Sequence, residues 1–217
     1  MKYYDISLEL SEKTIVWPGD GKFKRVESKG SAITSRMDIA THFGTHIDAP
    51  KHFLFNRPGI DSIPVNKLIG KCLVIEVRSV SPSLPKKGLG GVQKESLIRP
   101  KDFAHVNIKA RDKILFKTRN SQLLKKKTFV DNYVSLALDA AKYLASKKID
   151  LVGIDYFGIE AKSAPGHPVH KTLLAKGIVI IEAVDLSRIK PGKYNIAALP
   201  LKIKASDGSP ARVILWK

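Results

Sequence analysis

The sequence predicts an α/β fold in a single strand-rich domain, and three observations support this. Several short segments either alternate apolar and polar residues or are continuously apolar, which is typical of β-strands. One segment in the second half shows clear helical periodicity instead. No internal repeat and no linker divides the chain, so residues 1–217 are expected to form one domain.

The expected strands occur along the whole chain. Alternating residues predict strands near 3–9, 36–42 and 71–77, and residues 113–117 are another short candidate. Continuous apolar runs predict strands buried on both faces at 149–155 and 177–182. The tail predicts two more strands, at 194–203 and 211–216, joined by a turn at Ser206–Pro210.

The clearest helix is expected directly after Ser135, which can cap its first turn. Asp139 falls where the positive end of the helix dipole favours a carboxylate. The apolar positions of this helix are Leu136, Ala140, Ala141 and Leu144. A second helix-like segment is Lys171–Leu174, and the Pro/Gly/Lys-rich stretch 82–100 predicts an exposed loop.

The composition narrows the function classes. A formal charge of +18, from 38 basic and 20 acidic residues, could indicate a nucleic-acid partner. Most of the basic residues are scattered lysines rather than the arginines that read base edges, which favours a solvated surface and no nucleic-acid partner. No apolar run could span a membrane, and the single Cys72 excludes an internal disulfide. A cytoplasmic protein without a membrane partner is expected.

Three of the six histidines cluster within residues 41–52. Gly44 and Pro50 argue against a helix there, so an extended chain is expected. Alternation along such a chain would put His42, His46, Asp48 and His52 on one face. Imidazoles and a carboxylate on one face favour a metal site for zinc, manganese or iron over a chance polar surface.

The second half offers further candidates for ligands. His167 and His170 lie beside turn residues, and Glu182 ends an apolar strand, where a carboxylate is costly to bury unless it is paired or bound to a metal. Spacing alone does not decide whether these residues join the first cluster.

The run from His42 to His52 reads His-x-Gly-Thr-His-x-Asp-x-Pro-x-His. It resembles the motif of the cyclase family of metal-dependent hydrolases, which includes the bacterial kynurenine formamidases. The resemblance extends over nearly the whole chain, through Trp17-Pro-Gly19, His167-Pro-Val-His170, Ile181-Glu182 and Asp207–Arg212. One departure is Tyr156–Glu160, where many relatives have a serine-containing loop, and this leaves the substrate open.

The resemblance implies a swivelling β/β/α core that assembles as a homodimer or homotetramer. It also implies two divalent ions per chain, with zinc as the first choice and manganese as the second. Their ligands would be His42, His46, Asp48, His170 and Glu182, with both carboxylates bridging. His52 would be the catalytic acid/base and Trp17 would line the substrate pocket.

The expected activity is that of an arylformamidase of tryptophan catabolism, which hydrolyses N-formylkynurenine to kynurenine and formate. One alternative is a hydrolase of another small linear or cyclic amide, such as an imide or an isatin-like lactam. A second alternative, from a different class, is a basic nucleic-acid-binding protein with a structural metal. Structural zinc sites usually include cysteine, and Cys72 is the only one here, which argues against that alternative.

Overall fold

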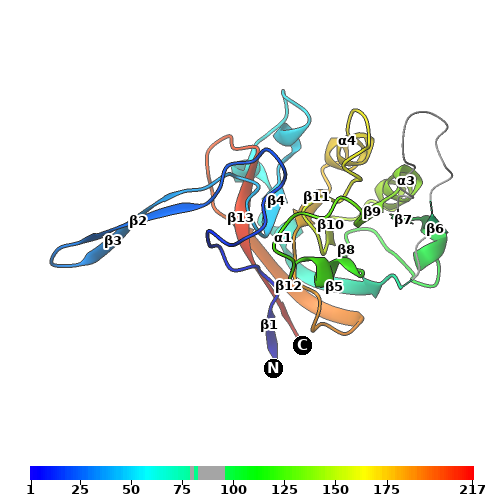
Figure 1. Cartoon of the computed structure of the whole chain (residues 1–217). Coiled ribbons are helices and arrows are strands. Elements are labelled where there is room, and N and C mark those ends of the chain that lie inside the picture. Colours follow the sequence, from blue (N-terminus) through cyan, green and yellow to red (C-terminus); the bar gives the residue numbers. More distant parts are fainter. Residues whose placement is uncertain (79–80, 83–95) are drawn as a thin grey trace, which may run out of the picture.

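A closed β-barrel forms the centre of the molecule in the computed structural model, which describes residues 1–78, 81–82 and 96–217 (Figure 1). Among the described residues seven strands close the barrel, because β4 pairs with both of its neighbours in the ring. The strands follow one another around it as β13 (Gly208–Trp216), β12 (Gly192–Pro200), β5 (Ile69–Glu76), β8 (Lys113–Lys117), β10 (Leu151–Ile154), β11 (Val179–Glu182) and β4 (His46–Asp48). β1 (Tyr3–Asp5) pairs with the end of β13.

Two helices cover one side of the barrel. The strands β5, β8, β10 and β11 are parallel to one another, and α3 (Leu138–Ser146) and α4 (Pro168–Ala175) pack over them (Figure 1). In β8, Ile114 and Phe116 point into the core beneath these helices, whereas Leu115 points into the barrel. Both faces of β10 and β11 are buried, as their continuous apolar sequences predict.

The remaining elements are short or peripheral. The hairpin of β2 (Lys24–Lys29) and β3 (Ile33–Asp38) extends away from the barrel, with every strand residue exposed (Figure 1). A small sheet contains β6 (Ser81–Pro82), β7 (Ser96–Ile98) and β9 (Val134–Leu136). The short helical turns are η1 (Pro50–His52), η2 (Ile60–Ser62), α1 (Val65–Leu68), η3 (Pro100–Phe103) and α2 (Asn120–Leu123). None of the helices in the described ranges has the length and apolar character needed to cross a membrane.

The α/β, strand-rich prediction is confirmed, and so are the six strands predicted between residues 71 and 216, with small shifts at their ends. The strand expected near 3–9 ends at Asp5, and the strand expected at 36–42 is instead β3, which ends at Asp38. The exposed strand β2 was not predicted, because its charged residues carry no apolar alternation.

Two further predictions need correction. Ser135 does not cap α3, because it is buried in β9 and Ala137 occupies the N-cap position. The expected loop at 82–100 contains β7 and the start of η3, while residues 83–95 lie outside the described residues.

Candidate metal centre

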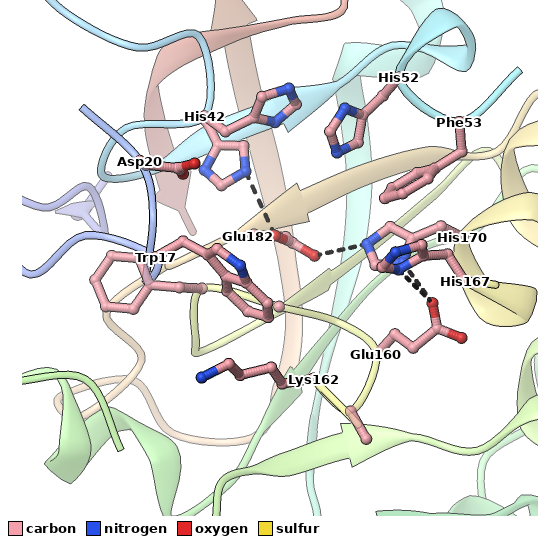
Figure 2. A pocket seen from close by; sticks show the side chains of 14 residues that line it. Trp17, Asp20, His42, His52, Phe53, Glu160, Lys162, His167, His170 and Glu182 are labelled. Atoms are coloured by element: carbon pink, nitrogen blue, oxygen red, sulfur yellow. Dashed lines mark hydrogen bonds and ion pairs between the residues drawn. The ribbon is translucent and has the colours of Figure 1, made fainter. Parts of the chain in front are cut away.

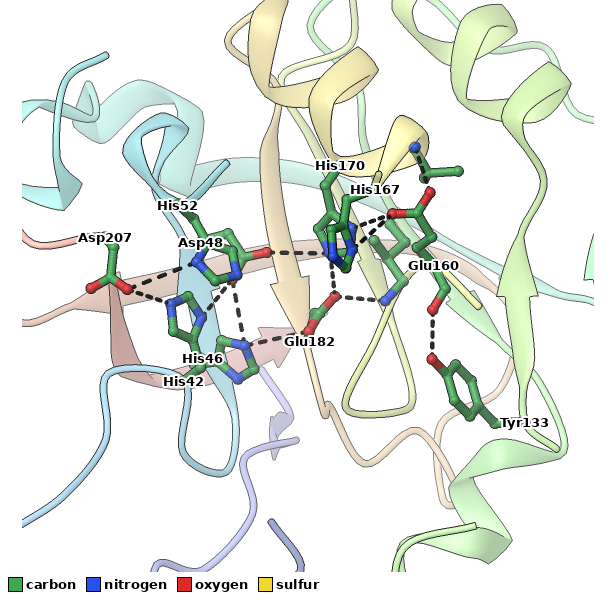
Figure 3. Close-up of polar contacts among 12 residues, drawn as sticks. His42, His46, Asp48, His52, Tyr133, Glu160, His167, His170, Glu182 and Asp207 are labelled. Carbon is green, nitrogen blue, oxygen red and sulfur yellow. Dashed lines mark hydrogen bonds and ion pairs between the residues drawn. The ribbon is translucent and has the colours of Figure 1, made fainter. Parts of the chain in front are cut away.

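The register between β4 and β11 aligns the first three side chains of the centre. Glu182 stands opposite His46, and Ile180 stands opposite Asp48. Directly opposed residues of antiparallel strands share a face of the sheet, and so do residues two apart in one strand. The His46 Nε2 atom accordingly lies 3.4 Å from Glu182 Oε2 and 3.5 Å from Asp48 Oδ1 (Figure 3).

A tight turn, and not the expected extended chain, brings His42 to the same place. Within the predicted extended segment 42–52, only residues 46–48 form a strand, and residues 50–52 form the helical turn η1, so the prediction of one extended segment is wrong. Gly44 has a positive φ of 62°, and a Cβ there would lie 2.6 Å from Leu10 Cδ2. The turn places His42 Nδ1 3.0 Å from Asp48 Oδ1.

Helix α4 supplies the remaining imidazole. Pro168 is the first residue of the helix, where the missing N–H has no cost, and His170 lies two residues further on in the same first turn. The His170 Nε2 atom is 3.2 Å from Glu182 Oε1 and 3.8 Å from Asp48 Oδ2. The structure thus brings together all five residues that the sequence resemblance named as ligands.

The chemistry of these side chains suits a divalent metal ion. Donor atoms of His46, Asp48 and Glu182 all lie within 4.8 Å of one another in a buried position. Asp48 Oδ2 is buried and has no hydrogen-bond partner among the described residues, which is costly for a carboxylate oxygen unless a cation satisfies it. Imidazole nitrogen with carboxylate oxygen is a donor set that zinc and manganese both accept.

The electrostatics of the cluster are those of closely coupled opposite charges. Burial alone would lower the pKa of each imidazole, but hydrogen bonds with carboxylates raise the pKa of His42 to about 9 and those of His46 and His170 to about 10. Burial would raise the pKa of Glu182, and the charge of Asp48 would add to this, but hydrogen bonds with imidazoles lower it to about 2. The imidazoles also hold the pKa of Asp48 well below its usual range against burial. Both carboxylates are therefore ionised near neutral pH.

His52 lies beside the cluster, at the end of η1. Its ring stacks on that of His42, with the centroids 3.9 Å apart, and its Nδ1 is 3.8 Å from Asp207 Oδ2, beyond hydrogen-bond distance. Burial lowers the pKa of His52, so its ring is neutral near pH 7. It is an imidazole at the pocket that can still accept a proton.

The sequence did not identify two carboxylates that lie at the centre. Asp207 Oδ2 lies 3.1 Å from His42 Nε2, and the buried Glu160 places Oε2 2.8 Å from His170 Nδ1 (Figure 3). Asp207 is the first residue of the Asp207–Arg212 motif. Glu160 is the last residue of Tyr156–Glu160, the segment where many relatives have a serine-containing loop. Their positions in the sequence did not show which histidine each would meet.

A pocket of about 240 Å³ opens onto the centre (Figure 2). Its wall contains Trp17, as the resemblance implies, and the rings of Phe53 and Phe157. It also contains one anionic and one cationic side chain, Asp20 and Lys162. The pocket can therefore enclose an aromatic group and present both charges to it.

His167 lies at the rim of this pocket. It is half-exposed, and its Nδ1 is 3.8 Å from Glu160 Oε2. Its backbone is left-handed, with φ and ψ both 53°, at the N-cap of α4. His167 therefore lies outside the group of five proposed ligands.

Comparisons with known proteins point to the family that the motif from His42 to His52 resembles. A model of the cyclase family matches residues 4–161. The kynurenine formamidase of Salinibacter ruber is 31% identical, over 99% of this chain and 97% of that protein. A solved structure described as a "potential metal-dependent hydrolase with cyclase activity" is 36% identical with a TM-score of 0.83, covering 99% of this chain and 96% of its own. Isatin hydrolase A from Labrenzia aggregata, at 22% identity and a TM-score of 0.79 over 99% and 93% of the two chains, shares the fold.

Proposed function

Because this chain belongs to the cyclase family, we propose that it is a binuclear metal-dependent amidohydrolase whose substrate is an aryl formamide. The protein is a hydrolase that acts on a C–N bond other than a peptide bond. The observation that carries the proposal is the convergence of five side chains from separate segments beside an aromatic pocket, where Asp48 Oδ2 has no hydrogen-bond partner among the described residues.

We assign His42 and His46 to one ion and His170 to the other, and we propose that the carboxylates of Asp48 and Glu182 would serve both ions. The distances within the cluster and the burial of these groups support this assignment. Zinc is the proposed metal and manganese the second choice. Ions at this position would polarise an amide carbonyl and lower the pKa of water.

His52 is the proposed proton carrier. Its neutral ring can take a proton from the attacking water and deliver it to the leaving nitrogen. Water thereby adds OH to the carbonyl carbon and H to the nitrogen as the C–N bond breaks. A formamide then yields formate and a free aromatic amine.

The pocket supports a zwitterionic aryl substrate, and N-formylkynurenine is the specific compound that we propose. Trp17, Phe53 and Phe157 can pack against the aryl ring. The Lys162 ammonium, which forms an ion pair with Asp131 at 2.7 Å, can also meet a substrate carboxylate, and Asp20 can meet an ammonium group.

A substrate screen on zinc-loaded protein tests the activity. Turnover of N-formylkynurenine should exceed that of formanilide, which lacks the charged groups, and that of cyclic imides and isatin. If isatin or an imide is turned over fastest, the formamide proposal is wrong and the cyclic-amide alternative replaces it. Absence of any hydrolysis by protein that carries metal would remove the amidohydrolase assignment itself.

Replacing Lys162 tests the pocket. Lys162→Met should raise KM for N-formylkynurenine by about tenfold, which corresponds to about 1.4 kcal/mol of binding. KM for formanilide should not change. Lys171→Met is the matched control, since Lys171 is an exposed lysine of α4 that does not line the pocket. An equal effect of Lys162→Met on both substrates would contradict recognition of the carboxylate.

Metal content tests the centre. Elemental analysis of reconstituted protein should give about two ions per chain. A value near one would contradict the binuclear version, and a value of zero would contradict the metal centre.

A further inference from the structure

We propose that Glu160 and Asp207 are positioning residues that fix the ring orientation and tautomer of His170 and His42, and thereby set the affinity of the centre for metal. This inference rests on the proposed metal ligands.

The three imidazoles of the cluster share one pattern. Each ring directs one nitrogen toward the bridging carboxylates, and its other nitrogen meets an oxygen outside the cluster (Figure 3). The outer partner of His46 Nδ1 is the Gly44 carbonyl oxygen at 2.9 Å. The outer partners of His42 and His170 are carboxylates, Asp207 and Glu160.

This pattern matters because a neutral imidazole binds a metal only through the nitrogen that carries no proton. An acceptor beside the outer nitrogen holds the proton there and turns the lone pair of the inner nitrogen toward the ion. His46 and His170 would then bind through Nε2, whereas His42 would bind through Nδ1. A carboxylate also raises the basicity of the ligand ring.

Glu160 is built to accept two donors at once. It is 2% exposed, and one oxygen accepts the Val169 N–H at 2.7 Å while the other pairs with His170 Nδ1 at 2.8 Å. Its own carbonyl oxygen accepts the Tyr133 hydroxyl at 2.5 Å, which holds the backbone of Glu160. The donor at Val169 belongs to the first turn of α4, so the same carboxylate anchors both the helix and its imidazole.

Glutamine cannot replace Glu160 in this arrangement. Its one carbonyl oxygen can accept from Val169 or from His170, and its NH2 group must then face the other donor. If the NH2 group faces His170 Nδ1, it favours the tautomer that carries the proton on Nε2, where the metal should bind.

Asp207 holds the outer nitrogen of His42 as Glu160 holds that of His170, but in a more solvent-exposed position. One of its oxygens accepts the Thr41 hydroxyl at 3.1 Å, and the other lies 3.1 Å from His42 Nε2. Its backbone carbonyl accepts the Ala49 N–H at 2.8 Å, directly after β4. The Asp207 side chain is 44% exposed, so water can partly replace it.

Zinc affinity, measured by competition with a chromophoric chelator, tests the proposal. Glu160→Gln should weaken binding of one ion by about 10–100-fold. Asp207→Asn should weaken binding less, because its site is solvated. Asp155→Asn is the control: Asp155 is also buried and also accepts several donors, from Thr118 and Ser121, but none of its hydrogen-bond partners among the described residues is an imidazole.

A spectroscopic readout separates positioning from general destabilisation. Long-range 1H–15N correlation spectra of zinc-loaded protein should show the proton of His170 on Nδ1 and that of His42 on Nε2. In Glu160→Gln the His170 pattern should change while that of His42 is kept, and Asp207→Asn should do the reverse.

The outcomes are distinguishable. Unchanged zinc affinity and tautomers in both variants would overturn this inference and leave the metal centre standing. Equal losses in Glu160→Gln and Asp155→Asn would also overturn it, because destabilisation would then explain both. Failure of the unmodified protein to bind zinc would instead refute the proposed function.

Discussion

Within the centre, His52 differs from the three imidazoles proposed as ligands. Each of those three rings meets an oxygen at both nitrogens, whereas His52 Nδ1 lies 3.8 Å from Asp207 Oδ2, beyond hydrogen-bond distance. Stacking on His42 holds the His52 ring at the pocket without using either of its nitrogens. His52 nevertheless has a donor atom within 4.8 Å of those of His42 and Asp48, so our proposal that it exchanges protons and holds no ion calls for a direct test.

The replacement His52→Ala should separate these two roles. We expect both metal ions to be retained and turnover to fall by about 10²–10⁴-fold, as is typical when a general acid/base is removed. Metal content and single-turnover rate measured on one preparation check this. If a metal ion is lost together with activity, His52 is a ligand.

Asp48→Ala should behave in the opposite way. Asp48 is in contact with His42, His46 and His170, so its loss removes the group on which both proposed ion sites depend. We expect metal and activity to disappear together, with the fold kept as judged by circular dichroism. A variant that retains both ions and normal turnover would show that Asp48 does not bridge.

At the scale of elements, the centre depends on strands that must lie at fixed spacing. β10 pairs with β8 on one side and with β11 on the other. β11 pairs in turn with β4, which places Glu182 opposite His46. Gly153 in β10 is what allows this close approach, because a Cβ there would lie 2.5 Å from Leu115 Cδ2 and 3.2 Å from the Ile181 carbonyl oxygen.

Gly153→Ala should therefore destabilise the barrel by about 1–3 kcal/mol, the usual cost of overfilling a packed interior. Urea unfolding measures this. Gly30→Ala, between β2 and β3, is the control, because nothing lies within 4 Å of the added Cβ. Equal stability of the two variants would mean that the strands around Gly153 can shift freely.

For the whole molecule, the pKa values connect metal binding to stability. Folding raises the pKa of His42 to about 9, and those of His46 and His170 to about 10, from 6.5. The stability that protonated imidazoles contribute is fully present below pH 6.5 and is lost as the pH rises through 9 to 10. A metal ion requires the deprotonated rings, so its affinity changes with pH in the opposite direction.

Protein kept in excess chelator should accordingly unfold at lower urea concentration at pH 9 than at pH 6.5. Zinc-loaded protein should lose less stability, or gain some, over the same interval. Urea midpoints at the two pH values, with and without zinc, check the signs. A larger midpoint at pH 9 in chelator would show that the imidazoles are not paired with carboxylates in the folded state.

The homodimer or homotetramer, the cytoplasmic location and the absence of a nucleic-acid partner stay predictions. The +18 charge bears on the last of these, and among the described lysines only Lys162 lines the pocket.

The sequence by itself determined the buried strands of the barrel and the cluster from His42 to His52, whereas the membership of His170 and Glu182 in the centre was implied only by the resemblance to the cyclase family. The strands and the cluster are local features, since apolar periodicity and fixed spacing are properties of one segment. Only the tertiary structure decided that β4 closes the barrel between β11 and β13, that Gly44 turns the chain, and that Glu160 and Asp207 meet the outer nitrogens of the imidazoles. Those contacts join segments that are distant along the chain, and residue spacing within each segment carries no information about which distant group it will face.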